Sequence, residues 1–230
     1  MAIPLTIAAG FWLTDQSALA DWIDRVFGPR KYYLISLVIV LYALLPFFMA
    51  FEGRKPEVRE LVVLATMIAL ATAGRAAFFM TPSFKPIIAI VIISAIAFGA
   101  EAGFLVGSMT MLVSNFLFGQ GPWTPWQMFA MGFIGFLSGI LYRLRILPTK
   151  RLQLSVYGFL VTFMIYGGIM NPAALFMSVY QFSWSGLLAI YISGVPVDLV
   201  HASSTFLFLW IGAKPLLEKL QRIKVKYGLL

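Results

Sequence analysis

The sequence predicts an all-α protein, a bundle of helices that crosses a membrane several times. Three observations support this fold class. Of the 230 residues, 61% are hydrophobic and only 11% are charged, and the mean hydropathy is +0.91. Soluble domains carry about 25% charged residues. Apolar stretches of about 20 residues, the length that spans a bilayer as a helix, follow one another with short polar breaks. We therefore expect one polytopic domain with six core helices and an extra N-terminal helix.

The N-terminal segment, residues 1–30, is expected to lie at the membrane interface. It lacks a basic start and soon turns acidic and amphipathic, which is not typical of a cleaved signal peptide, so we expect it to be retained. The membrane-embedded domain is predicted to cover residues 31–227. Its first span runs from about Tyr32 to Phe51, before the mixed-charge loop EGRKPEVRE.

The second span, from about Leu61 to Met80, carries a stripe of small side chains. Ala65, Ala69 and Ala73 recur every fourth residue, so they share one slowly drifting face of the helix. Small side chains let another helix approach closely in a membrane. The face is therefore expected to contact a helix, either of a partner or of the protein's own bundle.

The next apolar stretch, residues 86–118, is too long for a single spanning helix. At a rise of 1.5 Å per residue it would reach about 50 Å, whereas the hydrocarbon core is roughly 30 Å thick. The segment GAEAG, in which Gly99 and Gly103 flank Glu101, is the expected break. Two shorter helices are predicted, one on each side of it.

Three further helices are predicted after a polar bend, which lies within residues 114–133. They cover about residues 125–142, 152–177 and 196–217. The region 178–196, polar and aromatic, separates the last two and receives no predicted form. A basic tail ends the chain.

Positive charge predicts the orientation of the bundle. The 17 basic residues exceed the 9 acidic ones, and in a membrane protein such an excess marks cytoplasmic loops before it indicates nucleic-acid binding, which we do not expect. Basic residues crowd positions 143–151 and 214–226. These segments are predicted to be cytoplasmic, together with EGRKPEVRE, and the polar bend and residues 178–196 to lie outside. Arg25, Arg30 and Lys31 would then also lie outside, which counts against the scheme.

The bend SNFLFGQGPWTPWQMFAMGF, residues 114–133, holds unusual polarity for its place between two apolar segments. Part of it has a local explanation, because Thr124 and Gln127 match the Thr-x-x-Gln capping box and Pro125 suits a first helical turn. Tryptophans also collect at membrane interfaces without binding a ligand. Asn115 is harder to explain, because its amide lies on an apolar helix and needs partners.

Two other segments should face the same side of the membrane as this bend: the polar and aromatic region 178–196 and the end of the second span, with Arg75, Phe84 and Lys85. Together the three form a candidate binding site for a large, planar, polar ligand. On the last helix, Asp198 and His201 lie three residues apart, on one face, where they either contact ligand or form a satisfied intramembrane pair. Arg75 has an alternative role in snorkelling to the headgroups, and the amides in joining helices. The candidate substrate-binding residues are Arg75, Phe84, Lys85, Asn115, Gln120, Trp123, Trp126, Gln127, Trp184, Tyr191, Asp198 and His201.

Several chemistries have no support in the sequence. The chain has no cysteine and a single histidine, so we expect no metal site and no thiol chemistry. It contains no Walker-type phosphate loop, no His-Glu-x-x-His and no Gly-x-Ser-x-Gly. Uphill transport would therefore need partner subunits that supply energy, and no catalytic residue or cofactor is predicted.

Three stretches are specific enough to point to a known family: GRAAFFMTPSFKPIIAIVIISAIAFGAEAGFLVGSMTMLVSNFLFGQGPWTPWQMF, VDLVHASSTFLFLW and LEKLQRIKVKYGLL. They resemble the substrate-binding S components of energy-coupling factor (ECF) vitamin transporters, and among them the cobalamin type. The resemblance covers nearly everything from residue 31 onward. S components usually have six membrane helices, so the span at residues 32–51 is an additional one.

The resemblance implies a cell-membrane subunit that binds its vitamin from outside and performs no chemistry itself. It docks on a transmembrane coupling subunit, the T component, which two ATPase subunits power, and the docking motif corresponds to Ala65, Ala69 and Ala73 here. Cobalamin is then the transported ligand. The alternatives are an S component for a flat vitamin such as riboflavin, a membrane enzyme that uses Asp198 and His201 as acid and base, and a scaffold without a small ligand.

Overall fold

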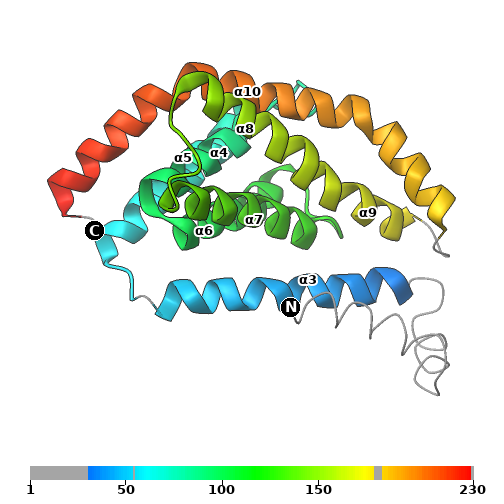
Figure 1. Cartoon of the computed structure of the whole chain (residues 1–230). Coiled ribbons are helices and arrows are strands. Elements are labelled where there is room, and N and C mark those ends of the chain that lie inside the picture. Colours follow the sequence, from blue (N-terminus) through cyan, green and yellow to red (C-terminus); the bar gives the residue numbers. More distant parts are fainter. Residues whose placement is uncertain (1–30, 54, 179–182, 229–230) are drawn as a thin grey trace.

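The computed structural model describes residues 31–53, 55–178 and 183–228, and this part of the chain is helical without strands (Figure 1). Seven helical segments form the bundle, and the all-α prediction is confirmed. Five of them are long and apolar enough to cross a membrane by length and composition. The segment 1–30, predicted to be interfacial, lies outside the described residues.

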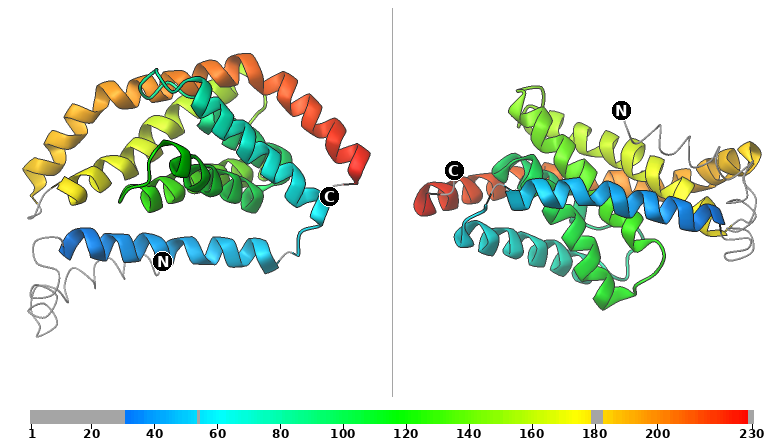
Figure 2. Two further views of the ribbon diagram at one scale, coloured as in Figure 1. Left: turned by 180° about the vertical axis from the view of Figure 1, so that it is seen from behind. Right: turned by 90° about the horizontal axis from the view of Figure 1, so that it is seen from below.

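The first described helix, α3 (Lys31–Gly53), is the extra N-terminal helix that the sequence predicts. It runs alongside the bundle at its edge (Figures 1 and 2). Phe47 fixes it there, because its ring stacks on Phe104 with centroids 4.1 Å apart and meets Phe136 edge-on at 4.9 Å. Aromatic pairs of this kind add about 0.5–1.5 kcal/mol beyond the area they bury.

Helix α4 (Val58–Ala77) carries the alanine stripe on an exposed face. Ala65, Ala69 and Ala73 are exposed in the structure, whereas Leu64 and Ala71 are buried against the bundle. Among the described residues, the stripe therefore remains open to a partner and does not serve the protein's own packing.

The long apolar stretch breaks at Gly99, as predicted. Helix α5 (Ile87–Phe98) ends there and α6 (Ala100–Phe118) begins, and Gly99 has φ +96°, a conformation that favours glycine. All twelve residues of α5 are buried, so it forms the centre of the core. A helix that is apolar all round has to be enclosed by protein or lipid.

Helices α6 and α7 (Thr124–Arg143) form a closely packed hairpin. The approach depends on residues without side chains: a Cβ atom on Gly103 would lie 2.8 Å from the carbonyl oxygen of Gly135. Gly107 likewise faces the backbone of Met131. The hairpin thus places the loop of residues 119–123, the middle of the polar bend, at one end of two tightly joined helices.

The next crossing is one continuous helix with a widened turn inside it. It consists of α8 (Arg151–Val161), the π-helical turn η2 (Thr162–Tyr166) and α9 (Gly167–Ser178). The Thr162 hydroxyl lies within hydrogen-bond distance of two acceptors, the carbonyl oxygen of Gly158 at 2.7 Å and Thr205 Oγ1 at 3.0 Å. Such turns often occur at functional sites because they change where a side chain points.

The last helix differs from the prediction. Helix α10 (Trp184–Tyr227) has 44 residues and begins twelve residues before Pro196, the expected start. Ser183 caps it by accepting a hydrogen bond from the Gly186 N–H at 3.1 Å. Its length, about 66 Å at 1.5 Å per residue, exceeds the roughly 30 Å hydrocarbon core. Figure 1 shows that α10 arches over the bundle, and Pro196 and Pro215 lie within it.

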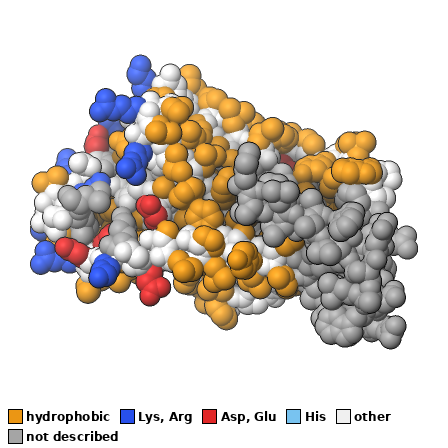
Figure 3. Space-filling view, turned by 60° about the horizontal axis from the view of Figure 1, so that its bottom comes forward, with side chains coloured by type: hydrophobic (Ala, Val, Ile, Leu, Met, Phe, Trp, Pro, Cys, Tyr) orange, Lys and Arg blue, Asp and Glu red, His pale blue; other side chains and the backbone are white. Residues whose placement is uncertain are grey.

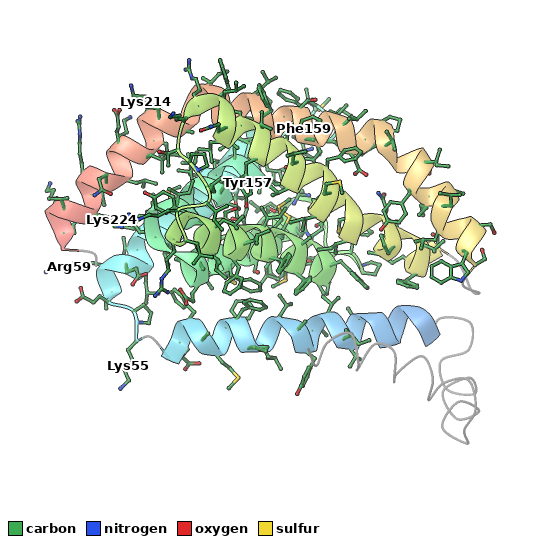
Figure 4. The ribbon with its side chains drawn as sticks, viewed as in Figure 1. Lys55, Arg59, Tyr157, Phe159, Lys214 and Lys224 are labelled. Carbon is green, nitrogen blue, oxygen red and sulfur yellow. The ribbon has the colours of Figure 1, made fainter. Side chains whose placement is uncertain are left out.

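Charged side chains gather at one end of the bundle. In the face shown in Figure 3, most of the basic and acidic groups lie at this end and hydrophobic side chains cover much of the remaining described surface. Figure 4 labels Lys55, Arg59, Lys214 and Lys224 on this side. Lys224 Nζ also donates to the carbonyl of Ala97 at 2.6 Å, which ties the end of α10 to the last turn of α5.

Candidate functional site

A buried cluster of polar side chains joins the ends of α4, α6 and α7. Arg75, near the end of α4, donates from Nη1 to Ser114 Oγ at 2.7 Å and to Asn115 Oδ1 at 2.6 Å. Its guanidinium also lies 5.2 Å from the ring centroid of Phe118. Asn115 and Ser114 are fully buried. Arg75 therefore points into the protein, and the alternative role in snorkelling does not describe its position.

Asn115 uses its amide nitrogen for the start of α7. Nδ2 donates to Thr124 Oγ1 and to Gln127 Oε1, each at 2.9 Å. Thr124 Oγ1 in turn donates to Gln120 Oε1 at 2.8 Å. The amides predicted as candidates are thus brought together in one network, with Arg75 at its other end.

The capping box predicted at Thr124 and Gln127 is wrong. Helix α7 begins at Thr124 after Trp123, and no side chain caps its first turn. The side chains of Thr124 and Gln127 turn instead toward Asn115. The tertiary network satisfies the groups that a local cap would have used, because Asn115 offers both a donor and an acceptor inside an apolar bundle.

Tyr166 extends the cluster toward α10. It lies in the π-helical turn, its hydroxyl interacts with the Gln127 side chain, and its ring meets that of His201 edge-on with centroids 4.7 Å apart. The widened turn places this ring beside α7 and α10 at once. Five elements therefore meet at the cluster, α4, α6, α7, η2 and α10.

Asp198 and His201 do not act as a pair with a common partner. His201 meets Tyr166, whereas Asp198 Oδ2 accepts a hydrogen bond from Asn171 Nδ2 of α9 at 2.8 Å. Glycines on both helices make room for this contact, because a Cβ on Gly167 would meet the Asp198 carboxylate and one on Gly194 would meet the Asn171 amide. The hydrogen bond between Asn171 and Asp198 joins α9 to α10.

Trp126 has the only buried side-chain nitrogen without a hydrogen-bond partner in the described part of the chain. Its ring packs in an apolar cluster with Val40 of α3 and Ala173 of α9, and faces Phe176 at 6.4 Å. The indole Nε1 is buried yet unpaired. Such a donor costs about 1–3 kcal/mol unless an acceptor reaches it, which makes it a candidate ligand contact.

The remaining predicted residues lie around the cluster and not in it. Phe84 packs on Phe208 with ring centroids 5.5 Å apart. Lys85 Nζ donates to the Thr81 carbonyl at 3.3 Å, and burial, followed by the charge of Arg75, lowers the pKa of Lys85. Tyr191 donates to the Gly168 carbonyl at 2.9 Å.

The two other tryptophans of the prediction are on the outside. Trp123 is 39% exposed and Trp184 is 78% exposed. Trp184 starts α10. The region 178–196, for which the sequence predicted no form, is therefore helical from this residue on. Neither ring belongs to the buried network.

Sequence reasoning missed Ser114, Tyr166 and Asn171. Ser114 directly precedes Asn115, and Asn171 precedes Pro172, yet short polar side chains are frequent in membrane helices and give no specific signal. Tyr166 reaches the cluster only because of the π-helical turn, which no sequence pattern predicts. No group of three or more potential metal ligands occurs among the described residues.

A second surface lies on the same helix as Arg75. The exposed face of α4 borders an apolar groove of about 430 Å³ between α4, α5 and α10. Its lining includes Leu70, Ala73 and Ala77 of α4 and Phe208 and Gly212 of α10. The groove and the alanine stripe form one apolar surface with small side chains.

The fold and these two surfaces define a class of protein: a polytopic helical membrane subunit with a buried polar cluster and an open small-residue face. The family model for the ECF-type riboflavin transporter, S component, matches residues 55–222. The chain belongs to this family, and it is a substrate-specific transport subunit. The match begins just before α4 and includes most of α10, so α3 lies outside it. No curated protein and no solved structure matches the chain.

Proposed function

We propose that this S component captures cobalamin or a related corrinoid at the polar cluster and delivers it inward with partner subunits. Membership of the family supports a substrate-binding role. The likeness of residues 74–129, 197–210 and 217–230 to cobalamin-type S components supports the corrinoid.

The observation that carries the proposal is the network around Asn115. Asn115 and Gln127 offer amides within helices that are otherwise apolar, Gln120 adds one from the loop between those helices, and Trp126 of α7 and Tyr166 of η2 supply aromatic rings. A corrin ring has a broad face and a fringe of amides. It could exchange hydrogen bonds with such side chains while its face packs on aromatic rings.

Riboflavin is the second candidate, because the matching family model is named for it. Its flat ring system also suits aromatic walls, and its carbonyl groups suit the Trp126 N–H. The two vitamins differ in size and in the number of amides that they present, and a direct binding comparison separates them.

The partners that we propose are a transmembrane coupling subunit and two ATPase subunits. Ala65, Ala69 and Ala73 would form the docking face, since they are exposed beside the apolar groove. Small residues allow close helix contact with little loss of side-chain entropy, which suits an interface that reforms in each cycle.

We further propose that the basic end of the bundle is cytoplasmic, following the positive-inside rule. The chain has no native cysteine, so single-cysteine variants report their side cleanly. In intact cells, a membrane-impermeant maleimide should label Ser185→Cys and leave Thr149→Cys unlabelled until the cells are opened. The reverse pattern would overturn the orientation.

The central experiment measures binding by the purified chain in nanodiscs. Cobalamin binding is followed by retention of its red absorbance, and riboflavin binding by quenching of its fluorescence, each against empty nanodiscs. We expect cobalamin to be retained and riboflavin not. Riboflavin binding alone would replace cobalamin with the second candidate, and binding of neither would contradict both.

Transport itself is tested in a host that cannot take up cobalamin. Labelled cobalamin should accumulate when this chain is expressed with the coupling and ATPase subunits. The chain without those partners should give no accumulation above background. Equal uptake in both strains would show that the subunit does not depend on an external energy source.

A further inference from the structure

Helix α4 connects the two surfaces described above. Ala73 of the exposed stripe and Arg75 of the buried network are separated by a single residue, yet the first faces outward and the second points into the bundle. Any displacement of the end of α4 therefore alters both surfaces together.

Two hydrogen-bond steps lead from α4 to the polar bend. In the first, one nitrogen of Arg75, Nη1, donates to Ser114 and Asn115 at the end of α6. In the second, Asn115 donates to Thr124 and Gln127 at the start of α7. Charged donors make shorter and stronger hydrogen bonds than neutral ones, so the first step holds α4 firmly to α6.

The hydrogen-bonding groups of the Asn115 amide are all engaged in this arrangement: the oxygen accepts from Arg75 and the nitrogen donates twice. A ligand that competes for Asn115 or Gln127 rearranges the network. Arg75 then loses an acceptor in a half-buried position, where a charged donor that lacks a partner is costly. A movement of α4 that brought Arg75 to another acceptor would relieve this cost.

We propose that Arg75 is a positioning residue that couples occupancy of the vitamin site to the docking face on α4. The inference rests on the proposed function. Coupling of this kind is reciprocal, so vitamin changes the affinity for the coupling subunit by the same factor by which the coupling subunit changes the affinity for vitamin. A purely structural role for Arg75 predicts no effect on that factor.

The experiment measures the affinity of the full-length chain for its coupling subunit in nanodiscs, with and without saturating cobalamin. Riboflavin serves as the probe if the binding assay identifies it as the vitamin. The ratio of the two affinities is the coupling factor. In the wild type we expect a factor of about 5 to 150, the usual range for allosteric coupling.

Arg75→Met, measured at a cobalamin concentration that saturates the variant, should bring this factor to about one. Arg75→Lys, which keeps the charge but loses the guanidinium geometry, should give an intermediate factor. Arg143→Met, an exposed arginine at the far end of α7, is the matched control and should keep the wild-type factor. Ser114→Ala removes one acceptor with little change in volume, and it carries the test if Arg75→Met does not fold.

An unchanged factor in the Arg75 variants, or in Ser114→Ala where they do not fold, would overturn the inference. So would a wild-type factor of one. Complete loss of vitamin binding in a well-folded Arg75→Met chain would identify Arg75 as a ligand contact and also contradict the positioning role. Each of these results leaves the proposed function standing, whereas a wild-type chain that binds no vitamin contradicts the proposed function itself.

Discussion

Gly103 of α6 and Gly135 of α7 face each other so closely that a Cβ atom on Gly103 would lie 2.8 Å from the Gly135 carbonyl oxygen. The contact is between backbones, which cannot move aside as a flexible side chain can. The close α6–α7 hairpin therefore depends on glycine at both positions.

Gly135→Ala should lower the stability of the bundle. The added methyl group would press on the backbone of Gly103, and overpacking of this kind costs about 1–3 kcal/mol. Thermal unfolding of the purified protein, monitored by size-exclusion chromatography, measures the effect. Gly212→Ala is the matched control, because nothing lies within 4 Å of its added Cβ. Equal melting temperatures for the two variants would contradict the predicted backbone contact.

Ala69→Trp should prevent assembly with the coupling subunit and leave vitamin binding intact. The indole would hold the partner helix away from the exposed stripe, and we expect a loss of about tenfold or more in docking affinity, equal to 1.4 kcal/mol. Co-purification and vitamin titration are measured on the same preparation. Leu160→Trp, on an exposed part of α8, should assemble normally. Lost vitamin binding with normal assembly would reverse the assignment of the surface.

Trp126→Phe should weaken vitamin binding by about 1–3 kcal/mol without destabilising the empty protein. The substitution keeps an aromatic ring beside Phe176 and removes the N–H that has no partner in the empty structure. Vitamin titration and thermal unfolding together give the two effects. Trp210→Phe, on a ring that contacts Arg151, should leave affinity unchanged. Wild-type affinity in Trp126→Phe would return this residue to a packing role.

Asn171→Ala should destabilise the contact between α9 and α10 by about 1–3 kcal/mol, because the Asp198 carboxylate loses its amide donor. The double variant Asn171→Ala/Asp198→Ala should be less destabilised than the sum of the two single variants. The melting temperatures of the wild type, the two single variants and the double variant form a double-mutant cycle. Strict additivity would show that the two side chains do not interact.

Local properties of the sequence predicted much of the fold. Hydropathy and stretch length gave the helical membrane bundle and the extra N-terminal helix, and the break at Gly99 followed from the excess length of residues 86–118. The start of the last helix was not predictable in this way. Pro196 looks like a helix start, yet α10 continues through it, and the Ser183 side chain caps an earlier beginning at Trp184.

The candidate site was predicted in part. The cost of a polar group on an apolar helix singled out Asn115, and the expected convergence of outer segments added Arg75 and Gln127. The structure brings these three together. Tyr166 was missed, because its position depends on one widened helical turn. Trp184 was included for its residue type, and the structure places it on the surface.

The sequence by itself determined that the chain is a helical membrane protein, where its helices can break and that one face of α4 carries small side chains. These properties depend on residues near one another in the chain, through hydropathy, periodicity and backbone freedom. Only the tertiary structure decided that Arg75 bonds to Asn115, 40 residues away, and that it does so from the same helix that carries the exposed stripe. The reason is physical. A hydrogen bond between distant segments forms only where packing brings a donor and an acceptor together, and the spacing of residues along the chain does not predict which segments will pack against each other.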